Sequence, residues 1–195
     1  SRQFEELCLL IHTIRRQNAK RVIVVIPYFG AGRQDRAKKE GDDVLAKMHA
    51  SILSSLGPDW ILMMDLHNEG IRHFFDNSVR PRELYLESLF VKVIESLCLK
   101  DFVFVSADVG RLNWVRSYAE KFGVDAATLD QRREGPAQKK VFNIVGNVAA
   151  KDIILIDDIV DSGGTVLLGA KALKASGAKD IHLFAAINNT NLLRI

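Results

Sequence analysis

Cysteine is scarce in this chain of 195 residues, in which Cys8 and Cys98 are the two thiols. Two widely separated cysteines exclude a disulfide scaffold and the paired spacing of a zinc site. Each lies inside an apolar helical pattern, so we expect both thiols to be buried and reduced. No apolar run reaches the roughly 20 residues of a membrane helix, and no signal peptide is visible. We therefore expect a cytoplasmic protein with no membrane partner.

The chain also lacks the marks of a nucleic-acid-binding protein. It has 27 basic and 24 acidic residues, for a net charge of +3 and a pI near 8.9. The basic residues are spread along the chain, and no signature motif of an RNA-binding module occurs. Two local basic clusters, at residues 33–39 and 132–140, suit small anionic substrates as well as a polyanion. We expect no nucleic-acid partner.

Apolar residues make up 48% of the chain, which is ample for a packed core. Short, near-continuous apolar stretches alternate with amphipathic helical patterns along most of its length. This alternation predicts an α/β fold built on a doubly wound parallel sheet. Strands are expected at residues 22–26, 61–64, 102–105, 126–129, 141–144, 153–156 and 181–186, and helices at residues 5–16, 43–55, 83–97, 111–122 and 166–176.

The most informative stretch runs from Ile153 to Thr165. Four apolar residues predict a buried strand, and Asp157 and Asp158 follow at its carboxyl end, where parallel sheets place ligands. Small residues and two glycines then allow backbone N–H groups and the start of a helix to approach an anion. A phosphate fits this turn, and the acids suit sugar hydroxyls or a metal-bound sugar. The residues of the turn are Asp161, Ser162, Gly163, Gly164 and Thr165.

The same turn, taken alone, is also an ordinary strand-to-helix connection. Two adjacent acids at the end of a buried strand favour a ligand, because like charges repel unless something cationic or hydroxylic uses them. The turn is not a nucleotide-binding Walker loop, since no Gly-Lys-Ser/Thr follows the glycines.

Three further strands end in polar residues. Arg33, Gln34 and Asp35 follow the first, where guanidinium groups could grip a polyphosphate or form a solvated patch. Asp65 and His67 follow the second and project to one side, so they could share a metal ion or form a simple acid–imidazole pair. Because oxygen ligands prevail here, magnesium is favoured over zinc. Two further acids belong to this set of polar residues. Asp76 lies nearby in the sequence, and Asp108 follows the third strand.

A basic connection between residues 130 and 140 contains Gly135 and Pro136. A loop of this length is either disordered or a functional lid. Arg132 and Arg133 at its base could stabilise the charge of a transferring phosphoryl group.

Together these segments resemble the ribose-phosphate diphosphokinases, which make phosphoribosyl pyrophosphate. The matching stretches follow one another in the family order, from about residue 5 to residue 186. They are residues 24–30 with 33–35, residues 64–67 with 70–71 and 74–76, residues 105–110, residues 143–148 and residues 156–165.

The resemblance implies two phosphoribosyltransferase-like, doubly wound domains with the active site between them. Residues 1–84 would form an incomplete first domain on the ATP and magnesium side, and residues 85–195 a second domain on the ribose 5-phosphate side. It also implies a homo-oligomer of dimers within a hexamer.

The resemblance further implies in-line attack by the anomeric hydroxyl of ribose 5-phosphate on the β-phosphorus of ATP, with AMP leaving. In family terms, Arg33, Gln34 and Asp35 would hold the ATP phosphates. His67 and Asp108, with Asp65 and Asp76 as further acids, would serve Mg²⁺. Arg133 would act in the catalytic lid. Ribose 5-phosphate would bind to Asp157, Asp158 and residues 161–165.

The chain departs from the family pattern at three positions. Gln131 stands where the catalytic lid has a lysine, Arg111 where a second glycine is usual, and Arg80 where an acid is common. Loss of one preorganised cation commonly costs about 3–4 kcal/mol of barrier. The main hypothesis is an active diphosphokinase; the alternatives are a non-catalytic or weakly active subunit of the same family, and a base phosphoribosyltransferase.

Overall fold

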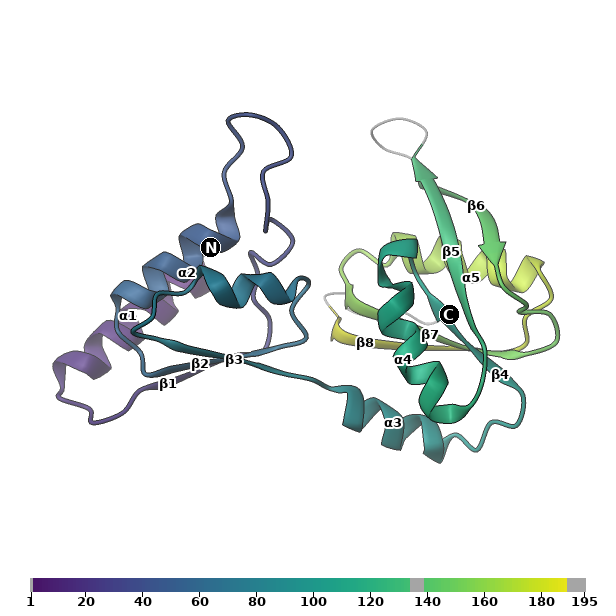
Figure 1. Ribbon diagram of the computed structural model, residues 1–195, viewed down its shortest axis with the longest axis horizontal. Helices are drawn as coiled ribbons and strands as arrows, with labels where there is room; N and C mark the ends of the chain where they lie inside the picture. The colour runs from purple at the N-terminus through teal and green to yellow at the C-terminus, as the bar shows by residue number, and fades with distance from the viewer. Residues whose placement is uncertain (1, 134–138, 189–195) are drawn as a thin grey trace. The chain divides into compact units, whose positions relative to one another are not determined.

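The computed structural model describes residues 2–133 and 139–188, and the side chains of all of these except residues 131–133, 139–142 and 188. Contacts between residues divide the chain into two compact units, Ser1–Tyr85 and Leu86–Ile195. Figure 1 shows both units, and each is described by itself.

The first unit contains a three-stranded parallel sheet in the order β1-β2-β3. Its two long helices cover the same face of this sheet (Figure 1), and their apolar residues share a core with Val24, Ile61 and Met63. Ile23 and Val25, which point to the other face, are 52% and 57% exposed. The elements are α1 (Arg2–Arg16), β1 (Ile23–Ile26), α2 (Leu45–Ser55), β2 (Trp60–Met64), η1 (Glu69–Phe74) and β3 (Arg80–Leu84).

Strand β3 corrects the sequence prediction, which placed the start of a helix at residue 83. The segment is charged and contains Pro81, so it does not look like a strand. It forms one because it lies at the edge of the described sheet, where a proline is tolerated and Arg80 and Arg82 remain exposed. The helix that follows, α3, begins at Glu87.

The second unit contains a five-stranded sheet in the order β6-β5-β4-β7-β8. Helix α5 packs on one face of the sheet over one apolar core, and helices α3 and α4 pack on the other face over a second core that they share. The unit is therefore doubly wound, as predicted. Its elements are α3 (Glu87–Ser96), β4 (Phe102–Ser106), η2 (Val109–Arg111), α4 (Leu112–Phe122), β5 (Ala126–Arg133), β6 (Lys139–Val145), β7 (Asp152–Val160), α5 (Gly164–Ala175) and β8 (Ile181–Asn188).

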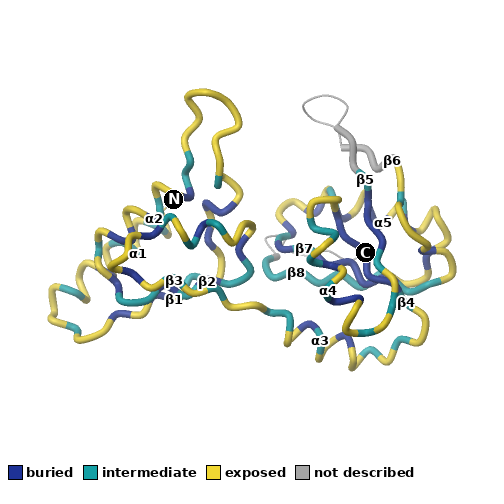
Figure 2. Tube along the Cα trace, in the orientation of Figure 1, coloured by how far each residue is buried: buried dark blue, intermediate teal, exposed yellow. Residues whose placement is uncertain are grey.

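Strand β7 lies between β4 and β8, at the most buried part of this sheet (Figure 2). The four apolar residues Ile153–Ile156 are 0% exposed, which confirms the predicted buried strand. On the α5 face the packing is very close at Gly169, where an added Cβ would lie 2.6 Å from Leu129 Cδ1. With any larger residue at this position, the Leu129 side chain or the helix would have to shift.

Strand β6 runs antiparallel to β5, although the sequence pattern suggested parallel strands throughout. The prediction of a loop over residues 130–140 was also wrong at both ends. The residues up to Arg133 and from Lys139 onward belong to paired strands. Antiparallel strands can be joined by a short connection, whereas parallel ones need a crossover. The remaining residues, 134–138, lie outside the part of the chain that the structure describes.

Neither cysteine is fully buried, contrary to expectation. Cys98 is exposed because it follows the end of α3 in a turn with a φ of 51°, and Cys8 is half-buried on α1. Across the described residues, no helix combines the length and apolarity that crossing a membrane would require.

A pair of leucines on α5 tests whether the core of the second unit has this packing. Leu173 is 0% exposed and Leu168 is 41% exposed. We expect Leu173→Ala to lower the free energy of unfolding by about 2–5 kcal/mol through the cavity it leaves, and Leu168→Ala to change it by less than about 1 kcal/mol. Urea unfolding followed by Trp114 fluorescence, in a Trp60→Phe background, measures both; equal losses would contradict the assigned core.

Candidate functional site

The acid pair of the second unit lies on the carboxyl-terminal part of β7, which continues past Ile156 to Val160. The backbone N–H of Asp158 donates a hydrogen bond of 2.9 Å to Oδ1 of Asp157. The side chain of Asp158 is 8% exposed. Because β4 and β7 are paired in parallel up to Ser106 and Ile156, residues that follow both strands meet at one edge. This edge is the usual ligand edge of a parallel sheet.

The loop after β7 leads directly into the amino end of α5. Gly163, at the N-cap position, has a φ of 74°, in the left-handed region that glycine adopts without strain. It has no side chain to cap the first turn of the helix, which begins at Gly164. The arrangement leaves the positive end of a twelve-residue helix facing the loop, which suits an anion such as a phosphate.

Burial and, after it, the neighbouring carboxyl of Asp158 raise the pKa of Asp157 to about 7. A more distant contribution comes from the charge of Asp108, which follows β4 at the same edge. Desolvation and like charges both favour the protonated carboxyl. The acid pair is therefore a place where hydroxyl groups or a cation would stabilise the charged form.

Arg111 is the residue at this site that the sequence interpretation gave no role. It ends η2, and its Nη2 lies 2.6 Å from Oδ2 of Asp158, in an ion pair with both side chains mostly buried. Its backbone N–H donates to Oδ1 of Asp108 at 3.0 Å, which caps η2. The only signal in the sequence was its departure from the glycine of the family pattern.

In the first unit, the two predicted binding segments lie next to each other. Nδ2 of Asn68 donates a 2.6 Å hydrogen bond to Oδ2 of Asp35. A Cβ placed on Gly32 would lie 3.9 Å from Cβ of His67. The structure therefore brings the segment of Arg33, Gln34 and Asp35 to the loop that contains Asp65 and His67.

Glu83 is a second residue that the sequence analysis missed. Its side chain, on β3, is 2% exposed, and its Oε1 accepts a 2.8 Å hydrogen bond from the backbone N–H of Leu66. Arg72 lies 3.6 Å from its other carboxyl oxygen. Burial raises the pKa of Glu83, against the lowering effect of the Leu66 hydrogen bond. The contact fixes the backbone between Asp65 and His67, and Asp65 has a φ of 35°, which a non-glycine residue seldom adopts.

The four residues expected to serve a metal do not form one cluster in either unit. Asp76 follows η1, and its backbone N–H donates to Oγ of Ser54 at the end of α2. Asp65 and His67 belong to the first unit and Asp108 to the second. Among the described residues, no three His, Cys, Asp or Glu side chains are placed to hold a metal ion.

The two residues expected in the catalytic lid, Gln131 and Arg133, lie on β5. Their backbones pair with β6, opposite Val141 and Lys139. Their side chains lie outside the described part of the chain.

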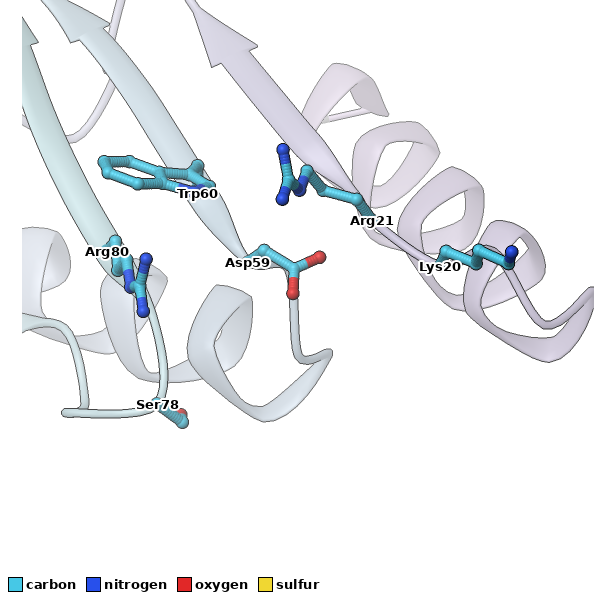
Figure 3. Close-up of a pocket in the computed structure, with 6 residues that line it drawn as sticks. All are labelled: Lys20, Arg21, Asp59, Trp60, Ser78 and Arg80. Carbon is cyan, nitrogen blue, oxygen red and sulfur yellow. The ribbon is translucent and has the colours of Figure 1, made fainter.

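A hollow lies at the end of the first sheet where its strands begin (Figure 3). It encloses about 290 Å³ and is lined by Lys20, Arg21, Asp59, Trp60, Ser78 and Arg80. The guanidinium of Arg80 lies 5.3 Å from the centre of the Trp60 ring, and that of Arg82 lies 5.6 Å from it. A hydrogen bond from the Val22 N–H and an ion pair with Arg15 lower the pKa of Asp59.

A doubly wound sheet with an acid pair and a glycine turn before a helix is the arrangement expected of a phosphoribosyltransferase-like domain. The family described as "Phosphoribosyl transferase domain" matches residues 80–192, and the chain belongs to this family. The family described as "N-terminal domain of ribose phosphate pyrophosphokinase" matches residues 1–57. The resemblance to the ribose-phosphate diphosphokinases is thereby confirmed.

Curated relatives point the same way. Ribose-phosphate pyrophosphokinase of Bradyrhizobium diazoefficiens is 38% identical over 180 residues, which are 92% of this chain and 56% of the relative. The protein of that name in Bacillus subtilis strain 168 is 37% identical over 177 residues, or 91% of this chain and 55% of the relative. The chain thus spans a little over half the length of these relatives.

The crystal structure of phosphoribosylpyrophosphate synthetase from Mycobacterium smegmatis is similar to the whole fold. Its TM-score is 0.84 at 28% sequence identity, and the match covers 95% of this chain and 60% of that one. The predicted α/β fold class is therefore confirmed.

The raised pKa of Asp157 predicts how stability depends on pH. The unfolded carboxyl ionises near pH 3.8 and the folded one near pH 7, so wild-type stability falls as the pH rises from about 4 to about 7. Asp157→Asn removes this loss. We expect the variant to gain stability over the wild type by on the order of 1–4 kcal/mol between these pH values, with a constant difference above pH 7. Urea unfolding at a series of pH values measures the difference; a gap that stays the same from pH 4 to pH 8 would contradict it.

Proposed function

We propose that this chain carries the catalytic parts of a ribose-phosphate diphosphokinase. It would transfer the β,γ-diphosphoryl group of ATP to the anomeric hydroxyl of ribose 5-phosphate, giving phosphoribosyl pyrophosphate and AMP. The observation that carries the proposal is the acid pair and anion-binding turn at the end of β7, in a chain that also has the polar loops of a first, pyrophosphokinase-like unit.

The second unit would bind the sugar phosphate. The 5-phosphate would occupy the turn of residues 161–165, against the amino end of α5, and Asp157 and Asp158 would face the ribose hydroxyls. Carboxylates accept hydrogen bonds from hydroxyls strongly. Binding at these two points orients the anomeric oxygen, and orientation of this kind supplies much of the rate in phosphoryl transfer.

The first unit would bind ATP. Arg33, Gln34 and Asp35 would hold its phosphates, beside the loop of Asp65 and His67 that Glu83 positions. The anomeric oxygen would attack the β-phosphorus in line while the bond from that phosphorus to the AMP oxygen breaks. Arg133, in the predicted lid, would stabilise the charge on the transferring group.

The donor set fits magnesium held jointly with substrate. Since no three described ligand side chains gather, the ion would be bound by one or two protein groups and by phosphates, as Mg²⁺ commonly is. His67 and Asp108 would contribute, with Asp65 and Asp76 as further candidates. When bound, the ion neutralises charge on the ATP phosphates.

The partners proposed from the resemblance are ATP, ribose 5-phosphate and further copies of the same chain, in dimers within a hexamer. A cytoplasmic location is also proposed, since Cys8 and Cys98 are both free thiols.

A weakly active or regulatory subunit is the second candidate, and Gln131 is the residue that favours it. The third candidate, a base phosphoribosyltransferase, is less well supported. It would leave no function for the two polar segments of the first unit that the hydrogen bond between Asn68 and Asp35 joins.

The activity and the role of Gln131 can be tested together. We expect the chain, given ATP, ribose 5-phosphate and Mg²⁺, to form AMP and phosphoribosyl pyrophosphate, and Gln131→Lys to raise the rate about 10²–10³-fold by restoring one preorganised cation. Gln17→Lys, an exposed change with the same gain of charge, should leave the rate unchanged. Product formed by neither the wild type nor Gln131→Lys at saturating substrate would reject the proposed reaction.

The phosphate end of the site can be tested by removing one hydroxyl. Thr165→Val keeps the shape of the side chain but loses a donor in the first turn of α5. We expect ribose 5-phosphate to bind about tenfold more weakly, because a hydrogen bond to a charged group contributes about 1.5–3 kcal/mol. Isothermal titration calorimetry measures this, with the exposed Thr13→Val as matched control. An unchanged affinity in Thr165→Val would place the phosphate elsewhere.

A further inference from the structure

Arg111 places a cation inside the sugar site. The residue ends η2, directly after β4, and β4 pairs with β7. Its guanidinium reaches Oδ2 of Asp158 at 2.6 Å, and the side chains of Arg111 and Asp158 are 18% and 8% exposed. One of the two carboxylates expected to face ribose therefore already has a partner from the same chain.

The guanidinium of Arg111 contacts both Asp158 and Trp114, and the backbone of Arg111 is fixed as well. The backbone of Arg111 is tied to Oδ1 of Asp108. Its guanidinium carbon lies 5.4 Å from the centre of the Trp114 ring, which is within the range of a cation–π contact. An arginine fixed in this way loses little further freedom when a ligand binds, so it is preorganised.

This edge of the sheet needs a positive charge. Asp157, Asp158 and Asp108 are all acids of the same edge, and the pKa of Asp157 is raised by burial and by the two others. Without a cation, a bound sugar would meet neighbouring carboxylates whose charges repel one another. A bound metal ion could supply the positive charge, but Arg111 of the chain itself already supplies it.

A purely structural role for the ion pair between Arg111 and Asp158 explains its location less well. Buried ion pairs add little net stability compared with apolar residues of the same size. This pair is formed not in the core but on the acid doublet, at the edge where parallel sheets bind ligands.

We propose that Arg111 is the resident counter-cation of the sugar site, holding the carboxyl group of Asp158 in a fixed orientation so that ribose 5-phosphate binds to the second unit without Mg²⁺. The inference rests on the proposed function and deepens it, because it assigns magnesium to the ATP phosphates and not to the sugar. Arg111 is a positioning residue, acting through Asp158.

Calorimetric titration of the whole chain with ribose 5-phosphate, in EDTA and in excess MgCl₂, tests the proposal. We expect the wild-type Kd to differ by less than about threefold between the two buffers. Arg111→Met should weaken binding in EDTA by about tenfold or more, because Asp158 loses its ion pair with Arg111, and Mg²⁺ should restore most of the loss. Arg111→Lys, which keeps the charge, should remain independent of Mg²⁺.

Two controls keep the result interpretable. Arg116→Met removes the same charge from an exposed position on α4 and should bind as the wild type does. The double variant Arg111→Met/Asp158→Asn removes both charges, so it leaves no lone buried ion that could unfold the chain. We expect it to bind ribose 5-phosphate about tenfold more weakly in both buffers, with no rescue by Mg²⁺.

A wild-type affinity that depends on Mg²⁺ as strongly as that of Arg111→Met would overturn the assignment of Arg111 while leaving the sugar site in place. Wild-type affinity in the double variant would do the same. A wild type that binds no ribose 5-phosphate in either buffer would instead reject the proposed function.

Discussion

Burial of two neighbouring carboxyls on one strand is the constraint on which the second unit depends. Strand β7 is apolar and fully buried over Ile153–Ile156, and the same strand then carries Asp157 and Asp158. An environment that stabilises the strand opposes the charge of the acids that follow it. Three features offset this opposition. The guanidinium of Arg111 pairs with Asp158, a backbone N–H donates to Asp157, and the amino end of α5 follows the same strand.

Carboxyl groups position the polar loops of both units by the same physical means, from the buried Glu83 in the first unit and the exposed Asp108 in the second. Glu83 accepts the N–H of Leu66 in the first unit, and Asp108 accepts the N–H of Arg111 in the second. In each case a carboxylate satisfies a backbone donor that a regular strand or helix would otherwise pair. Loops fixed in this way can present charged side chains to an anionic substrate in a defined orientation.

The sequence predicted the buried strands well, because runs such as Ile153–Ile156 are apolar without interruption. It did not predict β3, because Pro81 and three charged neighbours do not form a strand-like pattern. The segment is a strand because it pairs with β2. The turn after β7 could be read from its glycines. The roles of Arg111 and Glu83 could not, because each depends on a partner far away in the chain: Asp158 and Leu66.

The absence of a side chain at Gly169 matters beyond the core. A methyl group at this position would lie 2.6 Å from Cδ1 of Leu129, so either the buried Leu129 side chain or the helix would have to move. Since α5 is a stiff rod that begins at the turn, a shift at its middle would be passed on to its first N–H groups. A shift of the helix would therefore reach the turn at which we propose that the phosphate binds. In this way, close packing at a core position remote from the acid pair bears on the proposed site.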